Sequence, residues 1–454
     1  MRIRPQARPA ATTAAAMVRA RERGETTSAD LVATAIHSAR QPDAAAVMIT
    51  LTAERAHYQA QASDRRAVRG ALRSRLDGVP VVWKDLFDVQ GTVTTCGSAS
   101  HLHDEPAAMD SHLVRRAHNS GLVTVGKTNL SEFAFSGLGM NLCFGTPANP
   151  LDPALIPGGS SSGSAVAVAR GIVPLAVGTD TSGSVRVPAA LCGIVGYRAS
   201  PGRYGPHDFA PLSATLDSVG FFATTVEDLV MMERVLRPAE PNQRTLPLRF
   251  VVPAGEWSED ANGEIDSDFD AVVTALRAAG AEVEVRELPS LVAAQRLMDT
   301  HGTIVGAEAF GLHGHRLDST APIEPATRRR LGSNACTSSS VAPVYTAMPG
   351  LRAAFAAELG DAMLLCPTVR QPPPRIADLQ ADPARYDAAN ATVLRTTMVL
   401  SYLGSCGITL PVPASRQGPR TGILLSRPAG DDVALLDRAA WVHHLMDRDW
   451  RNDT

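Results

Sequence analysis

The chain has 454 residues, of which 44% are hydrophobic and 20% are charged, and its formal net charge is −3. This composition is that of a globular protein with enough apolar residues to bury a full core. A net charge so close to neutral lacks the basic excess that neutralising phosphates requires, so nucleic acid is not expected as a partner.

The first half of the chain predicts helices followed by a sheet. Residues 12–69 are rich in Ala, Leu, Val and Arg with few Gly or Pro, which predicts two or three helices. Between residues 78 and 220, short β-branched runs at 79–82, 122–125, 172–177 and 194–197 alternate with Gly-rich turns and helical stretches. This alternation predicts an α/β fold, with a β-sheet sandwiched between α-helices.

The second half continues the pattern. Residues 225–236 predict a helix, and residues 248–252, 268–279 and 282–285 predict a βαβ unit that extends the same sheet. Further strands are predicted around Cys366, at 408–411 and at 421–425, before a helix at 432–446. We expect one domain over 1–454: a helical N-terminal region (1–75), a core (75–235), and the remaining strands and covering helices (236–454).

Cysteines and histidines give no metal or disulfide signal. The six cysteines are scattered without a CxxC pair, so we expect reduced thiols in a cytoplasmic protein. His101 with His103, and His313 with His315, lack nearby acidic ligands, and we expect no metal and no other cofactor. The Arg-rich N-terminus lacks an apolar signal region and predicts a surface helix. Arg170 breaks the longest apolar stretch, so no membrane association is expected.

Two short motifs match known patterns in the wrong context. GLVTVGKT at residues 121–128 fits the phosphate-binding pattern GxxxxGK[ST], but its β-branched centre favours a strand whose ladder would use the N–H groups a phosphate needs. GSSSG at residues 159–163 fits the GxSxG nucleophile elbow, but three prolines in residues 149–157 exclude the central strand before it. We therefore expect neither a nucleotide site nor a histidine-dependent triad.

The segment 157–188, PGGSSSGSAVAVARGIVPLAVGTDTSGSVRVP, carries the strongest functional signal. It places two Gly-flanked serines, Ser160 and Ser184, in two loops separated by one helix and one strand. The stretch GTDTSGS at 178–184 follows an apolar strand and leaves the sheet where open α/β sheets bind ligands. Its small residues would let backbone N–H groups converge on an oxyanion.

A nucleophilic serine also needs a base, and the chain offers just two lysines, Lys84 and Lys127. No histidine stands in a setting that marks it as the base. A buried, neutral Lys84 would serve if its pKa fell to about 7 to 8. The alternative is a surface Lys84 paired with Asp85, and the residues alone do not separate Lys84 from Lys127.

These residues resemble the amidase signature family of serine hydrolases. The resemblance is strong over residues 75–235, and the spacing of 24 residues between Ser160 and Ser184 equals that of the family. It implies a large mixed β-sheet between α-helices. The matching stretches are GVPVVWKDLFDVQG (78–91), TTCGS (94–98), VGKTNLSEFAFS (125–136), GTPANP (145–150), residues 157–202, LSATLDSVGFFATTVEDL (212–229) and, more weakly, CPT (366–368) and GITLPVP (407–413).

The resemblance also implies roles for individual residues. Ser184 would be the nucleophile, Ser160 the bridging serine on a cis peptide bond, and Lys84 the base. The oxyanion hole would be formed by backbone N–H groups of Thr181, Ser182, Gly183 and Ser184. Ser161, Asp180 and Arg186 would orient the serines and the loop, Arg186 as a support rather than a substrate ligand. Ala134, Phe135 and Ser136 would lie near the leaving group.

This sequence departs from the family pattern at a few positions. Ser162 and Ser182 stand where the family often has glycine, and Arg198-Ala199 replaces lysine-proline. Because a serine tolerates positive φ poorly, we expect an altered loop or pocket at Ser182. No departure removes a catalytic group.

The expected activity is hydrolysis of a small carboxamide, aryl-acetamide or ureide through an acyl-enzyme. The alternatives are the A-type subunit of a glutamine amidotransferase, an esterase and, less favoured, a non-enzymatic scaffold. The expected partner is a small-molecule amide, and a homodimer or a small partner subunit remains open. We expect the helical N-terminal region and residues 288–349 to shape the substrate pocket.

Overall fold

Eleven strands form one mixed sheet at the centre of the computed structural model, which describes residues 13–205, 208–237, 246–258, 262–335, 340–412 and 422–452. The order across the sheet is β1-β3-β2-β4-β6-β5-β10-β11-β9-β7-β8. Strands β3, β2 and β4 are parallel, as are β9, β7 and β8, and the strands between these groups pair antiparallel. The strands are β1 Met48–Leu51, β2 Pro80–Lys84, β3 Val123–Thr128, β4 Leu175–Thr179, β5 Val195–Arg198, β6 Val219–Ala223, β7 Arg249–Pro253, β8 Glu282–Arg286, β9 Met363–Pro367, β10 Ser405–Pro411 and β11 Gly422–Pro428.

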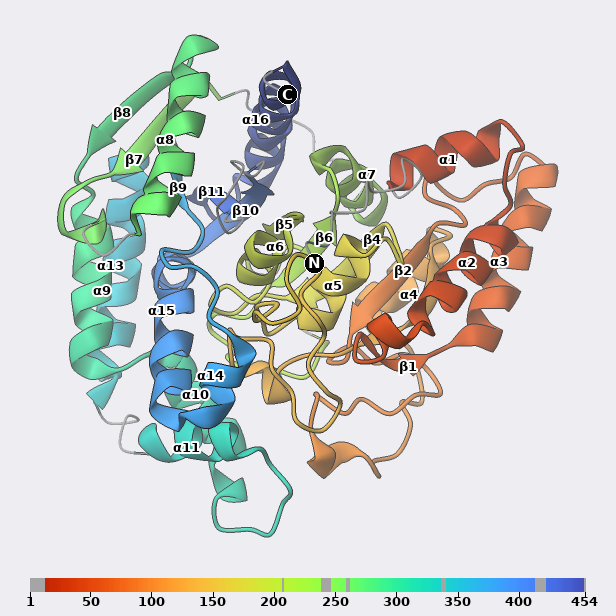
Figure 1. Ribbon diagram of the computed structural model, residues 1–454, viewed down its shortest axis with the longest axis horizontal. Coiled ribbons are helices and arrows are strands. Elements are labelled where there is room, and N and C mark those ends of the chain that lie inside the picture. The colour runs from red at the N-terminus through yellow and green to blue at the C-terminus, as the bar shows by residue number, and fades with distance from the viewer. Residues whose placement is uncertain are drawn as a thin grey trace, which may run out of the picture.

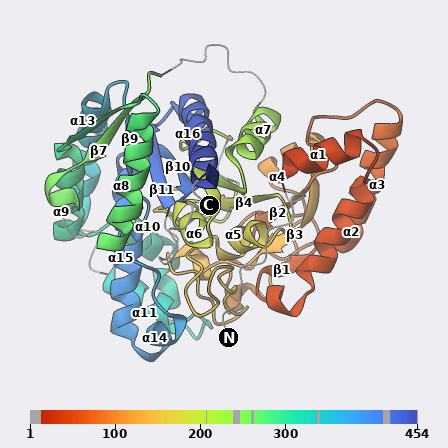
Figure 2. The same ribbon diagram turned by 45° about the horizontal axis from the view of Figure 1, so that its top comes forward.

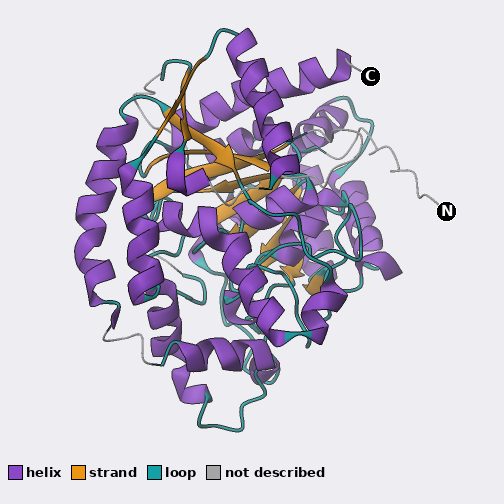
Figure 3. Ribbon diagram, turned by 60° about the vertical axis from the view of Figure 1, so that its left-hand side comes forward, coloured by secondary structure: helices purple, strands orange, loops and turns teal. Residues whose placement is uncertain are grey.

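Helices surround this sheet (Figure 3). Helices α2 and α3 lie beside β1 at one end, and α9 and α13 lie near β7 and β8 at the other (Figures 1 and 2). The helices are α1 Ala14–Glu22, α2 Ser28–Ala39, α3 Ala53–Val68, α4 His112–Asn119, α5 Ser162–Ala169, α6 Arg186–Cys192, α7 Val226–Leu236, α8 Gly263–Ala278, α9 Pro289–His301, α10 Ile304–His313, α11 Pro325–Ser333, α13 Ala342–Leu359, α14 Ile376–Ala381, α15 Pro383–Tyr402 and α16 Asp432–Asn452.

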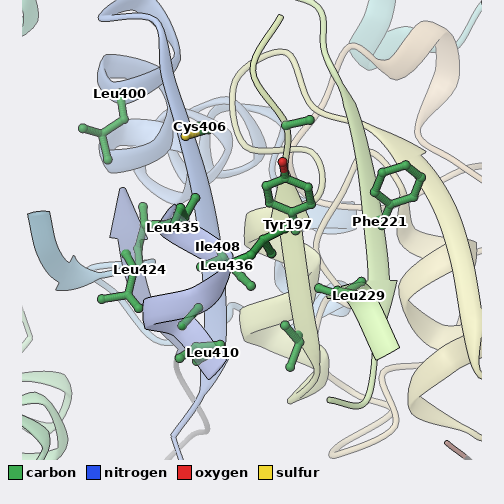
Figure 4. Packing of buried hydrophobic residues seen from close by; sticks show 14 of the residues in the cluster. Tyr197, Phe221, Leu229, Leu400, Cys406, Ile408, Leu410, Leu424, Leu435 and Leu436 are labelled. Atoms are coloured by element: carbon green, nitrogen blue, oxygen red, sulfur yellow. The ribbon is translucent and has the colours of Figure 1, made fainter. Parts of the chain in front are cut away.

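The sheet is buried on both faces because successive strand residues point in opposite directions. In β4, Leu175 and Val177 join a cluster with α7 and α16, whereas Ala176 between them joins a second cluster with α2, α3 and α5. Figure 4 shows part of the first cluster, where Leu229 of α7 and Leu435 of α16 pack against β5, β6, β10 and β11. This accounts for the continuous apolar runs that predict the strands.

The α/β fold predicted from the sequence is confirmed, including the placement of β7 and β8 in the same sheet. The predicted helical N-terminal region contains the helices α1, α2 and α3 but also an unpredicted strand, β1, which pairs antiparallel with β3. The predicted strand at 421–425 is β11 without Thr421, which lies outside the described residues, as do residues 1–12. In the part of the chain that is described, no helix is long and apolar enough to cross a membrane.

This topology brings strand ends from the core region together. Lys84 is the last residue of β2 and Thr179 the last of β4, and the two strands are parallel neighbours. Ser160 lies just before α5, and Ser184 lies just before α6. The carboxyl ends of β2 and β4 therefore meet two loops at one edge of the sheet, where α/β folds place their sites.

Candidate active site

Lys84 is fully buried at this edge and faces hydroxyl groups rather than acids. Its Nζ lies 2.6 Å from Ser160 Oγ and 2.9 Å from Thr179 Oγ1, both within hydrogen-bond distance. Burial lowers the pKa of Lys84 to about 7, an effect that the more distant charges of Asp217 and Asp180 only partly oppose. Near neutral pH, a large fraction of Lys84 is therefore uncharged and able to accept a proton.

Lys127 is also buried, but it makes an ion pair. Its Nζ lies 2.5 Å from Asp85 Oδ1, and it donates to Thr94 Oγ1 at 2.7 Å and to the Val93 carbonyl at 3.0 Å. Burial raises the pKa of Asp85, and the charge of Lys127 opposes that rise. The pairing of Lys84 with Asp85 considered from the sequence is wrong, because Asp85 is bound by the other lysine.

The two motif serines lie on loops that are tied to each other. The peptide bond between Gly159 and Ser160 is cis, as the resemblance implies. The Ser161 N–H donates to the Ser184 carbonyl at 3.2 Å, and Ser161 Oγ donates to the Thr179 carbonyl at 3.2 Å. Ser160 is fully buried, whereas Ser184 retains 4% of its surface and lines a pocket. The serine nearer to the lysine is thus sealed in, and the other is open to a ligand.

Asp180 and Arg186 hold the loop that carries Ser184. Asp180 accepts hydrogen bonds from the backbone N–H groups of Gly183 (2.7 Å) and Val185 (3.1 Å), and from Arg186 Nε (3.0 Å) and Nη2 (2.9 Å). Burial would raise the pKa of Asp180, but the Arg186 and Arg198 guanidiniums hold it well below its usual range. Arg186 is itself fully buried, so its geometry is that of a support for the loop.

The backbone of this loop offers three free N–H groups. Thr181, Ser182 and Ser184 have no acceptor for their N–H among the described residues, whereas the Gly183 N–H donates to Asp180. Of the four N–H groups expected to form an oxyanion hole, that of Gly183 is therefore already engaged. Gly183 has φ +134°, and a side chain there would collide with Thr397.

The loop or pocket alteration expected at Ser182 assumed a positive φ, and Ser182 does not have one. The unusual conformation falls one residue later, on Gly183, which tolerates it. The Ser182 carbonyl accepts a hydrogen bond from Thr397 Oγ1 at 2.5 Å. Ser182 therefore imposes no positive-φ strain on the loop.

A pocket that is partly open to solvent leads to Ser184. The apolar lining is formed by Ala134, Phe135, Leu212, Val305, Leu394 and Met398, together with Gly306. The polar lining is formed by Ser136, Ser182, Ser184, Thr303, Arg330 and Asn334.

The lining tests several expectations. Residues 134–136 do lie beside Ser184, and the expected contribution of residues 288–349 is present through Thr303, Gly306, Arg330 and neighbours. The expectation for the helical N-terminal region is wrong, because no described residue before 134 lines this pocket. Helix α15, which the sequence analysis did not place at the site, contributes Leu394 and Met398 instead.

Sequence reasoning also missed residues that contact Lys84 or support the loop that carries Ser184. Thr179 Oγ1 contacts Lys84, Asp217 accepts a hydrogen bond from Thr181 Oγ1 at 2.5 Å, and Arg198 donates to the Asp180 carbonyl. Asp217 lies inside the matched stretch 212–229 and Arg198 at a noted departure, so both positions carried a signal. Thr179 carried only its position at the end of a predicted strand.

The histidine pairs considered from the sequence make other contacts. His313 stacks on Phe133 with ring centroids 4.3 Å apart, and His101 lies 2.5 Å from Asp104 Oδ2. Within the described ranges, no group of three or more His, Cys, Asp or Glu residues is arranged to hold a metal ion. The cysteines at 96, 143, 192, 366 and 406 form no disulfide with one another, and Cys336 lies outside the described residues.

Comparison with known proteins agrees with this geometry. A family model described as Amidase matches residues 30–436. A 2-amino-5-chloromuconic acid deaminase from Comamonas testosteroni is 34% identical over 93% of this chain and 94% of its own. The A-type subunit of a glutamyl-tRNA(Gln) amidotransferase from Deinococcus deserti is 30% identical over 94% of this chain and 95% of its own.

The fold of this chain is also similar to that of a known amidase. A crystal structure of an amidase superposes with a TM-score of 0.85 at 27% identity, covering 96% of this chain and 100% of that one. The family match, the relatives and the superposition extend along nearly the whole chain. The chain therefore belongs to the amidase signature family and is an amide-cleaving hydrolase.

Proposed function

We propose that this protein hydrolyses a small carboxamide, aryl-acetamide or ureide through an acyl-enzyme on Ser184, with Ser160 as the bridging serine and Lys84 as the base. One observation carries the proposal. Lys84, which has a pKa of about 7, lies 2.6 Å from the hydroxyl of Ser160. The loop that carries Ser160 is hydrogen-bonded to the loop that carries Ser184. Such a lysine supplies the base that a serine nucleophile needs.

In the proposed acylation, neutral Lys84 takes the proton of Ser160, which takes the proton of Ser184 as its Oγ attacks the amide carbon. The structure has no hydroxyl–hydroxyl hydrogen bond between Ser160 and Ser184, both of which are described. Catalytic hydrogen bonds often tighten only when substrate is bound. We therefore expect the two hydroxyls to approach each other in the substrate complex.

The tetrahedral oxyanion would accept hydrogen bonds from the free N–H groups of Thr181, Ser182 and Ser184. Loss of one such donor costs about 2.7 to 4 kcal/mol of transition-state stabilisation in a serine protease. The C–N bond then breaks as the relay returns the proton to the departing nitrogen. Water loses a proton to the same relay and attacks the acyl ester, which releases the carboxylic acid and restores Ser184.

The substrate class follows from the pocket. The pocket is only partly open to solvent and its lining combines apolar and polar side chains, which favours a compact acyl or amine group over a polymer. A relative that covers nearly the whole chain is named as a deaminase of 2-amino-5-chloromuconic acid, which is itself a small molecule. No cofactor is needed for the proposed chemistry.

Covalent labelling tests the nucleophile. A fluorophosphonate should label the wild-type protein once, on the peptide that carries Ser184, and labelling should vanish in Ser184→Ala. Ser162→Ala is the matched control, since Ser162 is also buried but its hydroxyl has no hydrogen-bond partner among the described residues. Labelling that persists in Ser184→Ala would contradict the assignment. A screen of primary amides, anilides and ureides for released ammonia or amine would then narrow the substrate.

A second candidate is the A-type subunit of a glutamine amidotransferase, because a protein of that kind is 30% identical over 94% of this chain. That function predicts glutaminase activity that depends on partner subunits. Hydrolysis of small amides by the isolated chain favours the first proposal. An esterase would use the same residues, and relative rates on a matched amide and ester separate these two activities.

A further inference from the structure

The pocket holds one side chain whose chemistry the proposed reaction does not use. Among its described lining residues, Arg330 alone carries a charge, and no acid lines the pocket. The guanidinium carbon lies 4.3 Å from the centroid of the Phe135 ring. Its Nη1 is buried and has no hydrogen-bond partner in the described structure. Such an unpaired donor on a charged group is costly unless a ligand supplies an acceptor.

The neighbouring arginines of α11 show that this situation is specific to Arg330. Arg328 donates to the carbonyls of Leu317 (3.0 Å) and Ala321 (3.4 Å). Arg329 makes an ion pair with Asp387, with Nε 3.1 Å from Oδ2. Asp387 is also the carboxylate whose charge acts on Arg330, but it is already paired with the guanidinium of Arg329. Of three consecutive arginines, the one in the pocket lacks an acceptor.

Other polar groups of the lining are already engaged. Ser136 Oγ donates to Asn390 at 3.1 Å and accepts from Tyr386 at 3.0 Å. Thr303 Oγ1 accepts the Gly306 N–H at 3.0 Å, and Asn334 Nδ2 donates to the Arg330 carbonyl at 2.7 Å. Besides the catalytic loop, Arg330 is thus the described group best placed to recognise a polar part of a ligand.

We propose that Arg330 binds a carboxylate on the substrate, so that the preferred substrates are small amides carrying a free acid, such as the half-amides of short dicarboxylic acids. A guanidinium stacked on an aromatic face keeps its in-plane N–H groups available, and these match the two oxygens of a carboxylate. A single positive charge balances one carboxylate, whereas a phosphate carries about 1.5 to 2 negative charges at neutral pH. This inference rests on the proposed amidase function.

Binding without turnover tests Arg330 separately from catalysis. In the Ser184→Ala background, calorimetry should show that succinamate binds and that its neutral counterpart, butyramide, binds about 10- to 100-fold more weakly. Adding Arg330→Met, which keeps an unbranched side chain over Phe135, should remove that preference, and adding Arg329→Met should leave it intact. Equal affinity for the two ligands in Ser184→Ala would overturn the proposal even if amide hydrolysis is established.

Turnover provides the second readout. The ratio of kcat/KM for succinamate to kcat/KM for butyramide should fall about 10- to 100-fold in Arg330→Met, mainly through the KM for succinamate. Arg329→Met should keep the wild-type ratio. If Arg330→Met does not fold, Arg330→Lys retains the charge and should lower the ratio by about tenfold because the two-pronged contact is lost. An unchanged ratio in the folded variant would refute the proposal, whereas failure of any amide to turn over refutes the amidase function instead.

Discussion

Lys84 and Lys127 lie on the neighbouring parallel strands β2 and β3, and both are fully buried. Lys127 meets the carboxylate of Asp85 at 2.5 Å, whereas Lys84 meets the hydroxyls of Ser160 and Thr179. Equal burial therefore leaves these two lysines in different electrostatic surroundings. Lys127 is ion-paired with a carboxylate, whereas Lys84 contacts hydroxyl groups and burial lowers its pKa to about 7.

The largest expected effect is on the catalytic side of this comparison. Lys84→Met should lower kcat by about 10⁴-fold, because removing one member of a relay disables the whole unit. Amide hydrolysis under saturating substrate measures it. Near-normal turnover would eliminate Lys84 as the base.

The same variant should not lose stability. The pKa of Lys84 is about 7 in the folded protein but about 10.4 when unfolded, so the unfolded state binds an extra proton between these values. The stability of the wild type therefore rises with pH between about 7 and 10.4. Below about pH 7, the folded protein bears the full cost of burying a charged Lys84. We expect the Tm of Lys84→Met at pH 6 to equal or exceed that of the wild type, with the difference shrinking towards pH 10.

The pH dependence of the wild type should report the same group. On a neutral amide, kcat/KM should rise with pH through a midpoint near 7 and then level off, because only neutral Lys84 accepts a proton. Two pH units below the midpoint, the rate should be about 100-fold below the plateau. A profile that stays flat down to pH 5 would show that the base titrates elsewhere.

On the structural side, Lys127→Met should destabilise the fold by about 3 to 5 kcal/mol, because Asp85 is left as an unpaired buried charge. Urea unfolding measures the change, and the double variant Lys127→Met/Asp85→Asn should recover part of it. The folded fraction should keep activity within about tenfold of the wild type. If Lys127→Met were stable but inactive, Lys127 rather than Lys84 would be the better candidate for the base.

The sequence predicted the serines and narrowed the base to two lysines, but it paired Lys84 with the wrong neighbour. Asp85 follows the last residue of β2, and Trp83 of β2 is the register partner of Lys127 in β3. Which lysine pairs with Asp85 depends on the register between β2 and β3. The sequence of β2 alone does not specify that register.

Strand β1 and part of the pocket lining were not predicted from the sequence, for different reasons. Strand β1 has four residues, all partly buried, so it lacks the apolar alternation that marks a strand. The pocket lining from α10, α11 and α15 comes from segments that carry no motif, and their placement depends on packing over long sequence separations. The loop that carries Ser184 was recognisable from the sequence because its glycine and hydroxyl residues form a motif.

All three proposed catalytic residues occur before residue 185, yet the loop that presents Ser184 is fastened by α15. Thr397 donates to the Ser182 carbonyl, and Arg186 Nη2 donates to Ser401 Oγ at 2.6 Å. During synthesis, the ribosome must therefore release more than 200 further residues before this loop has its supports. A gene fragment that encodes every signature motif but stops before α15 would carry the reactive groups without the means to position them.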